Sequence, residues 1–280
     1  MLDKYFKNKT FAVIAPAGRI DRTALDQAAK IWQSWGAKIK IMPHVTGFEE
    51  MFFSAPAELR AADINSAAAD DEVDFIICAR GGYGCAELEN LIDWELLKKN
   101  PRHFIGYSDI TALHQMLLRR NCGIPTVGAM FIKAPELFAA DQENAASFIR
   151  ALSGEKQIFK INADQPFHGK CIVGNLTVLS SLCGTDIMPD FDSKCLITED
   201  LNEPPYKIHR MLNQLVQNHI FERISALGTG DFLNCGDNGE VEKIFRAFAE
   251  RYDLPLYTNI PIGHGDRIHA VNMLNDISLI

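Results

Sequence analysis

The chain has 280 residues, of which 47% are hydrophobic and 23% charged, an ordinary balance for a globular protein. Its formal net charge of −8, with no cluster of Lys and Arg, argues against a protein that binds nucleic acid electrostatically. The length exceeds that of a typical domain of roughly 100–200 residues, so we expect two domains.

The seven cysteines are scattered, odd in number and contain no C-x-x-C pair. This spacing argues against a zinc ribbon or a disulfide framework and fits a reducing compartment. The apolar run at residues 11–15 is shorter than the roughly 7–15 residues of a signal-peptide core, and no later run approaches the roughly 20 of a membrane span. We therefore expect a soluble, cytoplasmic protein.

The first half of the chain alternates short apolar runs with helical spacing, which predicts βαβ units and a mostly parallel sheet flanked by helices, an α/β fold. The expected strands are residues 10–15, 38–42 and 74–79, a fourth that ends with the apolar run 104–105 and leads to Ser108, and a short fifth at 126–127. The expected helices are residues 21–35, about four turns from 54, a segment from 109 and a long helix over 135–152. This half is expected to form one domain, residues 1–152.

The pattern changes after residues 153–156, and a smaller C-terminal α+β domain is expected over residues 153–280. Its expected strands are residues 158–161, 170–173, 195–199, 224–228 and 255–259, with a glycine turn at 174–175. Its expected helices begin at Pro204 and at Glu240.

The apolar run at residues 104–105 leads directly to Ser108, and helical spacing begins shortly after it. A serine on a sharp strand-to-helix turn has the geometry of a nucleophile elbow, with its hydroxyl beside the positive end of a helix. The position two after the serine, small in the usual elbow, is Ile110 here. On this stretch alone, Ser108 is better interpreted as a helix N-cap, because serine leads the N-cap ranking.

Residues 80–84, Arg-Gly-Gly-Tyr-Gly, follow the third expected strand. Three glycines in four residues let backbone N–H groups approach a ligand closely. The spacing differs from the dinucleotide fingerprint G-x-G-x-x-G, and a nest for a carboxylate or an oxyanion suits the loop better. A plain tight turn is an equal alternative.

Three carboxylates lie within residues 199–203, where another expected strand ends. Glu199 closes the apolar run, so we expect it to be partly buried, and a buried carboxylate needs a partner. One use of such a group is to orient the histidine of a serine triad. Asn202 or Glu203 is expected to cap the helix that begins at Pro204, with Glu203 as our choice.

Among eight histidines, His264 is distinctive because it lies between two glycines at the end of an expected strand, where loops often carry chemistry. His103 and His114 flank Ser108 and are rival bases. His114 lies nearly two helical turns beyond the serine, too far for a direct hydrogen bond. For any single histidine, a structural role is the default expectation.

Together and in this order, the motifs resemble those of the LD-carboxypeptidase family, serine peptidases that include muropeptide LD-carboxypeptidase A and the microcin-immunity peptidases. The matching stretches, which span nearly the whole chain, are residues 14–18, 79–84, 105–112, 174–176, 199–206, 210–212 and 263–264. Each stretch is short alone, but the set is specific.

The resemblance implies a serine-type carboxypeptidase with a Ser–Glu–His triad. The nucleophile of the family falls on Ser108, its carboxylate on Glu199 and its histidine on His264. Its oxyanion donors, which are backbone N–H groups, fall on Gly82 or a neighbour and on Asp109. The serine would come from the first domain and the other two residues from the second, with the site between them.

The same resemblance implies a tetrapeptide muropeptide as substrate, cut at its terminal D-alanine after an L-configured centre of meso-diaminopimelate during murein recycling. Arg80 is a candidate for binding the terminal carboxylate. No metal or organic cofactor is implied, and neither a nucleic acid nor a membrane partner is expected. We expect a homodimer.

Two departures from the family pattern bear on the substrate more than on the triad. Ala129 stands where the family usually has proline, and residues 268–274 replace a Leu-Pro-Leu-Gly-like stretch. Two alternatives stay open. One is a related serine peptidase that cleaves a peptidyl- or aminoacyl-nucleotide antibiotic, which should carry an aromatic platform for the base; the other is a catalytically silent muropeptide-binding protein.

Overall fold

The computed structural model describes residues 1–48, 51–161, 163, 165–237 and 239–280. Its largest sheet has six strands in the order β12-β5-β4-β3-β1-β2. Five strands are parallel: β1 (Thr10–Ile14), β2 (Lys38–Ile41), β3 (Phe75–Cys78), β4 (His103–Gly106) and β5 (Ile124–Val127). β12 (Val271–Asn272), from near the C-terminus, pairs antiparallel with β5.

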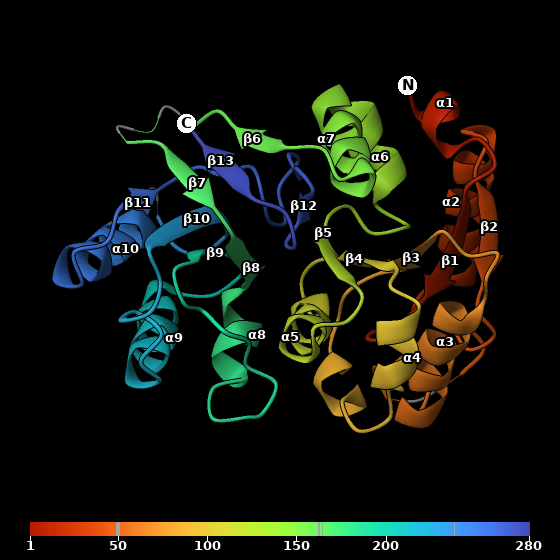
Figure 1. Ribbon diagram of the computed structural model, residues 1–280, viewed down its shortest axis with the longest axis horizontal. Helices are drawn as coiled ribbons and strands as arrows, with labels where there is room; N and C mark the ends of the chain where they lie inside the picture. Colours follow the sequence, from red (N-terminus) through yellow and green to blue (C-terminus); the bar gives the residue numbers. More distant parts are fainter. Residues whose placement is uncertain (49–50, 162, 164, 238) are drawn as a thin grey trace.

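Helices cover both faces of this sheet, as Figure 1 shows. One face carries α3 (Ala57–Ala69), α4 (Trp94–Lys99), α5 (Ile110–Arg120) and a short 3-10 helix, η1 (Cys85–Leu88). The other carries α1 (Leu2–Phe6), α2 (Arg22–Ser34), α6 (Ala134–Ala140) and α7 (Gln142–Ser153). This is the arrangement that alternating strands and helices predict.

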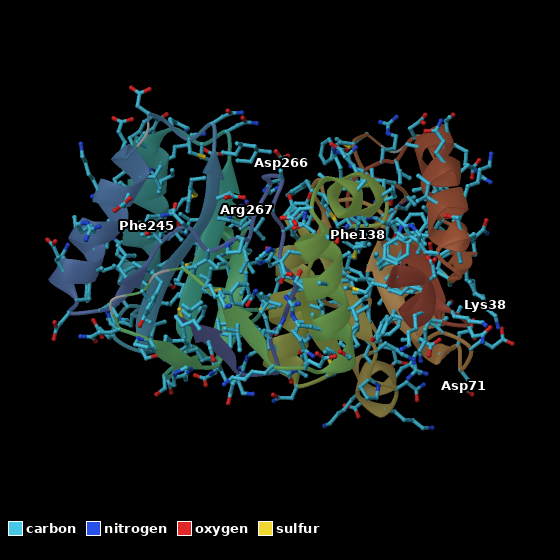
Figure 2. The ribbon with its side chains drawn as sticks, turned by 90° about the horizontal axis from the view of Figure 1, so that it is seen from above. Lys38, Asp71, Phe138, Phe245, Asp266 and Arg267 are labelled. Carbon is cyan, nitrogen blue, oxygen red and sulfur yellow. The ribbon has the colours of Figure 1, made fainter. Side chains whose placement is uncertain are left out.

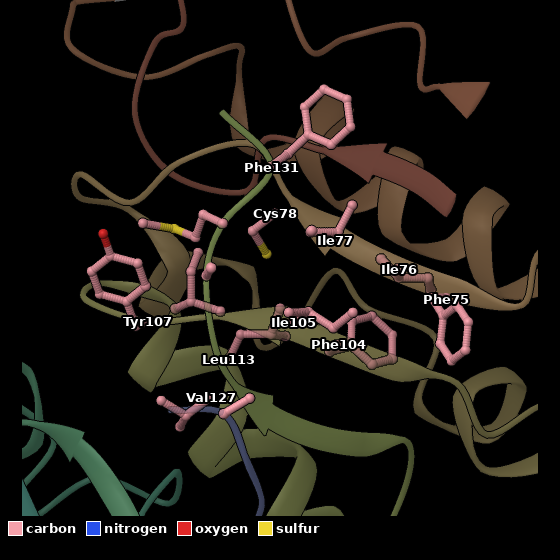
Figure 3. Close-up of a cluster of buried hydrophobic side chains, with 14 of the residues drawn as sticks. Phe75, Ile76, Ile77, Cys78, Phe104, Ile105, Tyr107, Leu113, Val127 and Phe131 are labelled. Carbon is pink, nitrogen blue, oxygen red and sulfur yellow. The ribbon is translucent and has the colours of Figure 1, made fainter. Parts of the chain in front are cut away.

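The strands of the large sheet are buried on both faces. Every residue of β3 and β4 is buried, as expected for a parallel sheet between two helix layers. Figure 3 shows their apolar side chains packed together with Tyr107, Leu113, Val127 and Phe131. Trp32 of α2 is fully buried, and its Nε1 donates a hydrogen bond to the Phe131 carbonyl at 3.0 Å. The sheet is therefore a rigid support for the turns at its ends.

The second half of the chain forms two smaller sheets beside the first (Figure 1). A parallel sheet has the order β11-β10-β9-β8 and a mixed sheet the order β6-β13-β7. The strands are β6 (Gln157–Phe159), β7 (Phe167–Gly169), β8 (Cys171–Asn175), β9 (Cys195–Leu201), β10 (Ala226–Leu233), β11 (Leu256–Tyr257) and β13 (Ile277–Leu279). The helices are α8 (Leu176–Ser181), α9 (Pro205–Gln217) and α10 (Glu240–Arg251).

The expected fold class is confirmed: a mainly parallel sheet flanked by helices, with a second, smaller sheet region. The division at residues 152 and 153 stays a prediction. The chain returns from the second region to the first as β12, within the stretch of residues 268–274 that departs from the family pattern. No helix in the described ranges is long and apolar enough to cross a membrane.

Two expected elements are wrong. The helix over 135–152 is two helices, because the chain is extended at Asp141, whose side chain accepts the Glu143 N–H at 2.8 Å and starts α7. The expected turn at 174–175 is the end of β8. Asn175 there is the N-cap of α8, a helix that the sequence pattern did not predict.

Candidate active site

Ser108 lies on the sharp turn between β4 and α5. Its φ of 63° is in the left-handed region, which is unusual for a residue other than glycine. Such a conformation costs on the order of 1–3 kcal/mol and is concentrated at functional sites. The N-cap position of α5 is Asp109, and no side chain caps this helix, so the interpretation of Ser108 as an N-cap is wrong.

The large residue two positions after the serine is accommodated by a glycine before it. A Cβ on Gly106 would lie only 2.8 Å from Cγ1 of Ile110. The space that the usual elbow leaves after the nucleophile is thus provided at Gly106. The turn keeps its sharpness although Ile110 is bulky.

The glycine loop after β3 lies directly against Ser108. A Cβ on Gly81 would lie 2.9 Å from Cβ and 3.1 Å from Oγ of the serine. A Cβ on Gly82, whose φ is 131°, would lie similarly close to the backbone of Gly18. The Gly18 N–H donates to the Gly81 carbonyl at 3.2 Å. Larger residues would push these three turns apart, which explains why glycines stand at these positions.

The backbone N–H groups of Gly82 and Asp109 have no acceptor within the part of the chain that the structure describes, and the same holds for those of Gly81 and Ser108 beside them. The Asp109 nitrogen would lie 3.7 Å from a Cβ on Gly81, so the two turns adjoin. The Asp109 carboxylate is buried and accepts the Cys85 N–H at 2.9 Å, which ties the start of α5 to the glycine loop. These free donors suit an oxyanion.

Glu199 and His264 form a buried pair. Glu199 Oε2 lies 2.6 Å from His264 Nδ1, and the side chains are 3% and 14% exposed. Because an ionised carboxylate only accepts hydrogen bonds, Nδ1 is the donor and Nε2 is left to take up a proton. A carboxylate that orients a histidine in this way is also found in serine triads.

Burial raises the pKa of the Glu199 carboxyl, an effect that the hydrogen bond from His264 partly offsets. Burial alone would lower the pKa of the His264 imidazole. The hydrogen bond and charge of Glu199 outweigh that effect, so the pKa of His264 is raised. The site therefore favours the imidazolium, the form that a general base adopts after taking a proton.

The ring of Tyr107 links the pair to the serine turn. It packs edge-on against His264, with centroids 4.9 Å apart, and it immediately precedes Ser108. Among the described residues, no hydrogen bond joins Ser108 Oγ to the imidazole. Such bonds are often long in enzymes without substrate. Tyr107 lies within the motif of residues 105–112, and the sequence alone does not predict this contact.

Side chains that no motif argument assigned connect the two halves of the chain behind the site. Thr111 Oγ1 of α5 accepts the Asn175 N–H at 2.9 Å, and Asn175 Nδ2 donates to Asp200 at 3.0 Å. Asp200, which follows Glu199, also accepts the N–H and the hydroxyl of Thr177 at 2.8 Å. These bonds fix the end of β9 relative to the turn that carries the serine.

The rival bases are buried and bond to residues outside the serine turn. His103 Nδ1 lies 2.9 Å from Thr126 Oγ1, and His114 Nε2 lies 2.8 Å from the Phe104 carbonyl. Burial lowers the pKa of each to about 4. Arg80, the candidate for substrate binding, is exposed and donates to the Arg19 carbonyl at 3.0 Å.

Two family models match the chain in the order of its halves. The LD-carboxypeptidase N-terminal domain matches residues 11–129, and the LD-carboxypeptidase C-terminal domain matches residues 168–279. A Bacillus subtilis protein named probable murein peptide carboxypeptidase is 31% identical over 92% of this chain and 84% of its own length. The chain belongs to the LD-carboxypeptidase family.

Two further family members are similar over most of their length. The murein tetrapeptide carboxypeptidase of Pseudomonas aeruginosa is 29% identical over 92% of this chain and 89% of its own. The crystal structure of muramoyltetrapeptide carboxypeptidase from Oxalobacter formigenes is 28% identical, with a TM-score of 0.82 over 95% of this chain and 92% of that one. Fold and sequence therefore agree on the family.

Residue 129 is alanine where the LD-carboxypeptidase family usually has proline, and hydrogen bonds hold the backbone around it. Ala129 is buried, and the residues on either side of it bond to the large sheet. Gly128 N–H donates to the Gly106 carbonyl at 3.2 Å and Phe131 N–H to the Cys78 carbonyl at 3.0 Å. These bonds to the ends of β4 and β3 hold the loop without a proline.

Glu203 does not cap the helix that follows it. The N-cap position of α9 is Pro204, and no side chain accepts a capping bond there. Glu203 instead pairs with Lys207 at 3.1 Å along the helix. Because Pro205 has no N–H, one of the donors that a cap would satisfy is absent.

A cavity of about 530 Å³ beside α10 contains none of the predicted catalytic residues; its lining includes Arg246, Glu250, Asp253 and Tyr257. It is open and polar, and Arg246 already pairs with Glu242 at 2.7 Å. Its described lining includes no serine, threonine or cysteine. Within the described ranges, no three His, Cys, Asp or Glu side chains are grouped so that they could hold a metal ion.

Proposed function

We propose that the protein is a serine carboxypeptidase that releases the terminal D-alanine from tetrapeptide muropeptides in murein recycling. The observation that carries the proposal is the Glu199–His264 pair, packed through Tyr107 against the strained turn of Ser108. The names of the related murein peptidases support the choice of substrate.

In the proposed reaction, His264 Nε2 takes the proton of Ser108 Oγ as the oxygen attacks the carbonyl carbon before D-alanine. The N–H groups of Gly82 and Asp109 stabilise the oxyanion that forms. Glu199 holds the imidazole through Nδ1 and stabilises its positive charge.

His264 then donates its proton to the leaving amine, and the C–N bond breaks to release D-alanine. A water molecule attacks the acyl-serine ester, with His264 as base again, and frees the shortened peptide and Ser108. We assign Arg80 to the terminal carboxylate of the substrate, because it adjoins the glycine loop. No metal or organic cofactor takes part in the proposed reaction.

We place this reaction in the cytoplasm. All seven cysteines are free and six are buried, which supports a reducing compartment. A homodimer stays a prediction, which light scattering on the purified protein would test.

The decisive experiment is incubation with purified tri-, tetra- and pentapeptide muropeptides, followed by mass analysis. We expect the tetrapeptide alone to become tripeptide plus free D-alanine, and Ser108→Ala to be inactive. An intact tetrapeptide with wild-type protein would overturn the proposal. Cleavage of an acyl-sulfamoyl adenylate instead would establish the alternative peptidase.

Reaction with a fluorophosphonate separates an enzyme from a silent binding protein. We expect labelling of the wild type and none of Ser108→Ala, since the probe needs an activated serine. Ser180→Ala is a matched control, because Ser180 Oγ only donates to the Thr177 carbonyl, at 3.0 Å in α8. Binding of muropeptide without labelling would favour the silent protein.

A further inference from the structure

Strand β10 is irregular directly opposite Glu199. Its register against β9 shifts after Thr229, so that Gly230 and Asp231 together face that one position. Such bulges bend a strand and re-aim a side chain, often next to an active site. A Cβ on Gly230 would overlap the carbonyl oxygen of Ile262, so glycine is required at the bulge. The irregularity turns Asp231 toward the loop that carries His264.

Asp231 holds that loop at two points. Its N–H donates to the Ile262 carbonyl at 2.7 Å, and its Oδ2 accepts the Gly265 N–H at 3.2 Å. These bonds lie on either side of His264 in the sequence. The loop packs closely on the carboxylate, because a Cβ on Gly263 would lie 2.9 Å from Asp231 Cβ and one on Gly265 would overlap Oδ2.

We propose that Asp231 is a positioning residue for His264, holding the loop on both sides of it and adding a further negative charge near the imidazole. The proposal rests on the proposed function, in which His264 is the general base. A base must keep its orientation through two proton transfers, and small displacements of a catalytic group are costly. The bonds from Asp231 supply this restraint from β10, whereas Glu199 supplies it from β9.

Several charged or titratable groups surround this region: Tyr107, Glu199, Asp200, Asp231, Asp266 and Arg267. Figure 2 shows Asp266 and Arg267 between the half that carries Phe138 and the half that carries Phe245. Burial raises the pKa of the Asp231 carboxyl, while the Gly265 N–H and Arg267 favour its ionised form. The charges of Asp200 and Asp231 add to that of Glu199 in raising the pKa of His264, with Asp231 contributing the least of the three.

The test compares Asp231→Asn, which keeps the size and an acceptor oxygen, with Asp231→Ala, which removes both acceptors and charge. The pKa of the His264 imidazole is measured by NMR titration, with the signal assigned by its loss in His264→Gln. We expect Asp231→Asn to lower this pKa by roughly 0.5–1 unit. Asp266→Asn is the matched control, because it removes a nearby exposed carboxylate that does not bond to the loop; the pKa should stay unchanged.

Kinetics on the tetrapeptide give the second measurement. We expect Asp231→Ala to lower kcat by roughly 10–100-fold with little change in KM, and Asp231→Asn to restore most of kcat. An unchanged His264 pKa in Asp231→Asn would overturn the proposal. A rise in KM alone would also overturn it, since Asp231 would then contact substrate.

The NMR arm separates this proposal from the proposed function. If the wild type leaves muropeptides intact while Asp231→Asn still shifts the His264 pKa, the proposed function fails and the positioning role stands. If Asp231→Ala does not fold, the Asn variant alone decides the outcome.

Discussion

Two strand-to-helix turns meet where the two halves of the chain adjoin, one after β4 and one after β8. In the first, Ser108 adopts φ of 63° and no side chain caps α5. In the second, Asn175 adopts φ of −67° and its Oδ1 accepts the Val178 N–H at 3.1 Å. The turns touch, because the Asn175 N–H donates to Thr111 Oγ1 in the first turn of α5.

The two turns use their side chains differently. Asn175 uses both polar atoms of its side chain within the protein, with Oδ1 capping the helix and Nδ2 donating to Asp200. Ser108 takes a conformation that costs free energy and keeps its hydroxyl out of the helix. The turn at Asn175, called the relaxed turn, contacts the strained turn at Ser108 through Thr111. We therefore expect loss of the Ser108 hydroxyl to lower activity and loss of the Asn175 side chain to lower stability.

The largest expected effect is at the strained turn. Ser108→Ala should lower turnover by a factor on the order of 10³ or more, because the covalent route is lost. The free energy of unfolding should change little, since Ser108 caps no helix. Turnover on the tetrapeptide and a urea melt check both statements. Near-normal turnover in the folded variant would exclude Ser108 as nucleophile.

Substitution of Glu199, which pairs in register with Asn175, should have the second-largest effect on turnover. Glu199→Gln keeps the shape but loses the charge that stabilises the imidazolium, so kcat should fall by about 10² to 10⁴. Glu203→Gln is the matched control four residues away. It loses only the pair with Lys207, and its turnover should stay within about tenfold of wild type. The reverse ranking would exchange the two roles.

The pH dependence of the wild type should report the same pair. Only neutral His264 can act as base, and Glu199 raises its pKa. The acid limb of kcat/KM should therefore lie above about 6.5, the ordinary pKa of histidine, with activity lost as pH falls through it. An acid limb below about 6.5 would contradict the view that Glu199 stabilises the His264 imidazolium.

At the relaxed turn, substitution of Asn175 should lower stability. Asn175→Ala removes the cap of α8 and the bond to Asp200, so the free energy of unfolding should fall by about 1–3 kcal/mol. Ser108→Gly is the informative partner, because glycine adopts positive φ without strain and should not destabilise the fold. Equal losses in both variants would remove the contrast between the turns.

The smallest expected effect is that of chelation. Neither turn needs a metal in the proposed reaction, so turnover should be unchanged after exhaustive treatment with EDTA. Loss of activity that zinc restores would replace the serine mechanism with that of a metallopeptidase.

Much of this arrangement could be predicted from the sequence, because its signals are local. Buried runs such as residues 74–79 identify the strands of the large sheet, and Ser108 follows one of them directly. Glu199 and His264 were expected to pair, and they lie 2.6 Å apart. Their catalytic roles stay predictions.

The errors have physical reasons. Apolar spacing continues across Asp141, so two helices resemble one in the sequence. Gly174 and Asn175 are typical turn residues, yet here they close a strand and cap a helix. The importance of Asp231 depends on a register shift between strands, which spacing along one chain does not reveal.

The antiparallel strand β12 has a consequence for how the molecule assembles. β5 lies at the edge of the large sheet until Val271 and Asn272, which come much later in the sequence, pair with it. During synthesis this edge stays open until residues 271–272 have been made. An open edge is a template for pairing with another chain, and contacts between distant residues form slowly. Removing residues 271–272 should therefore promote aggregation of the nascent protein.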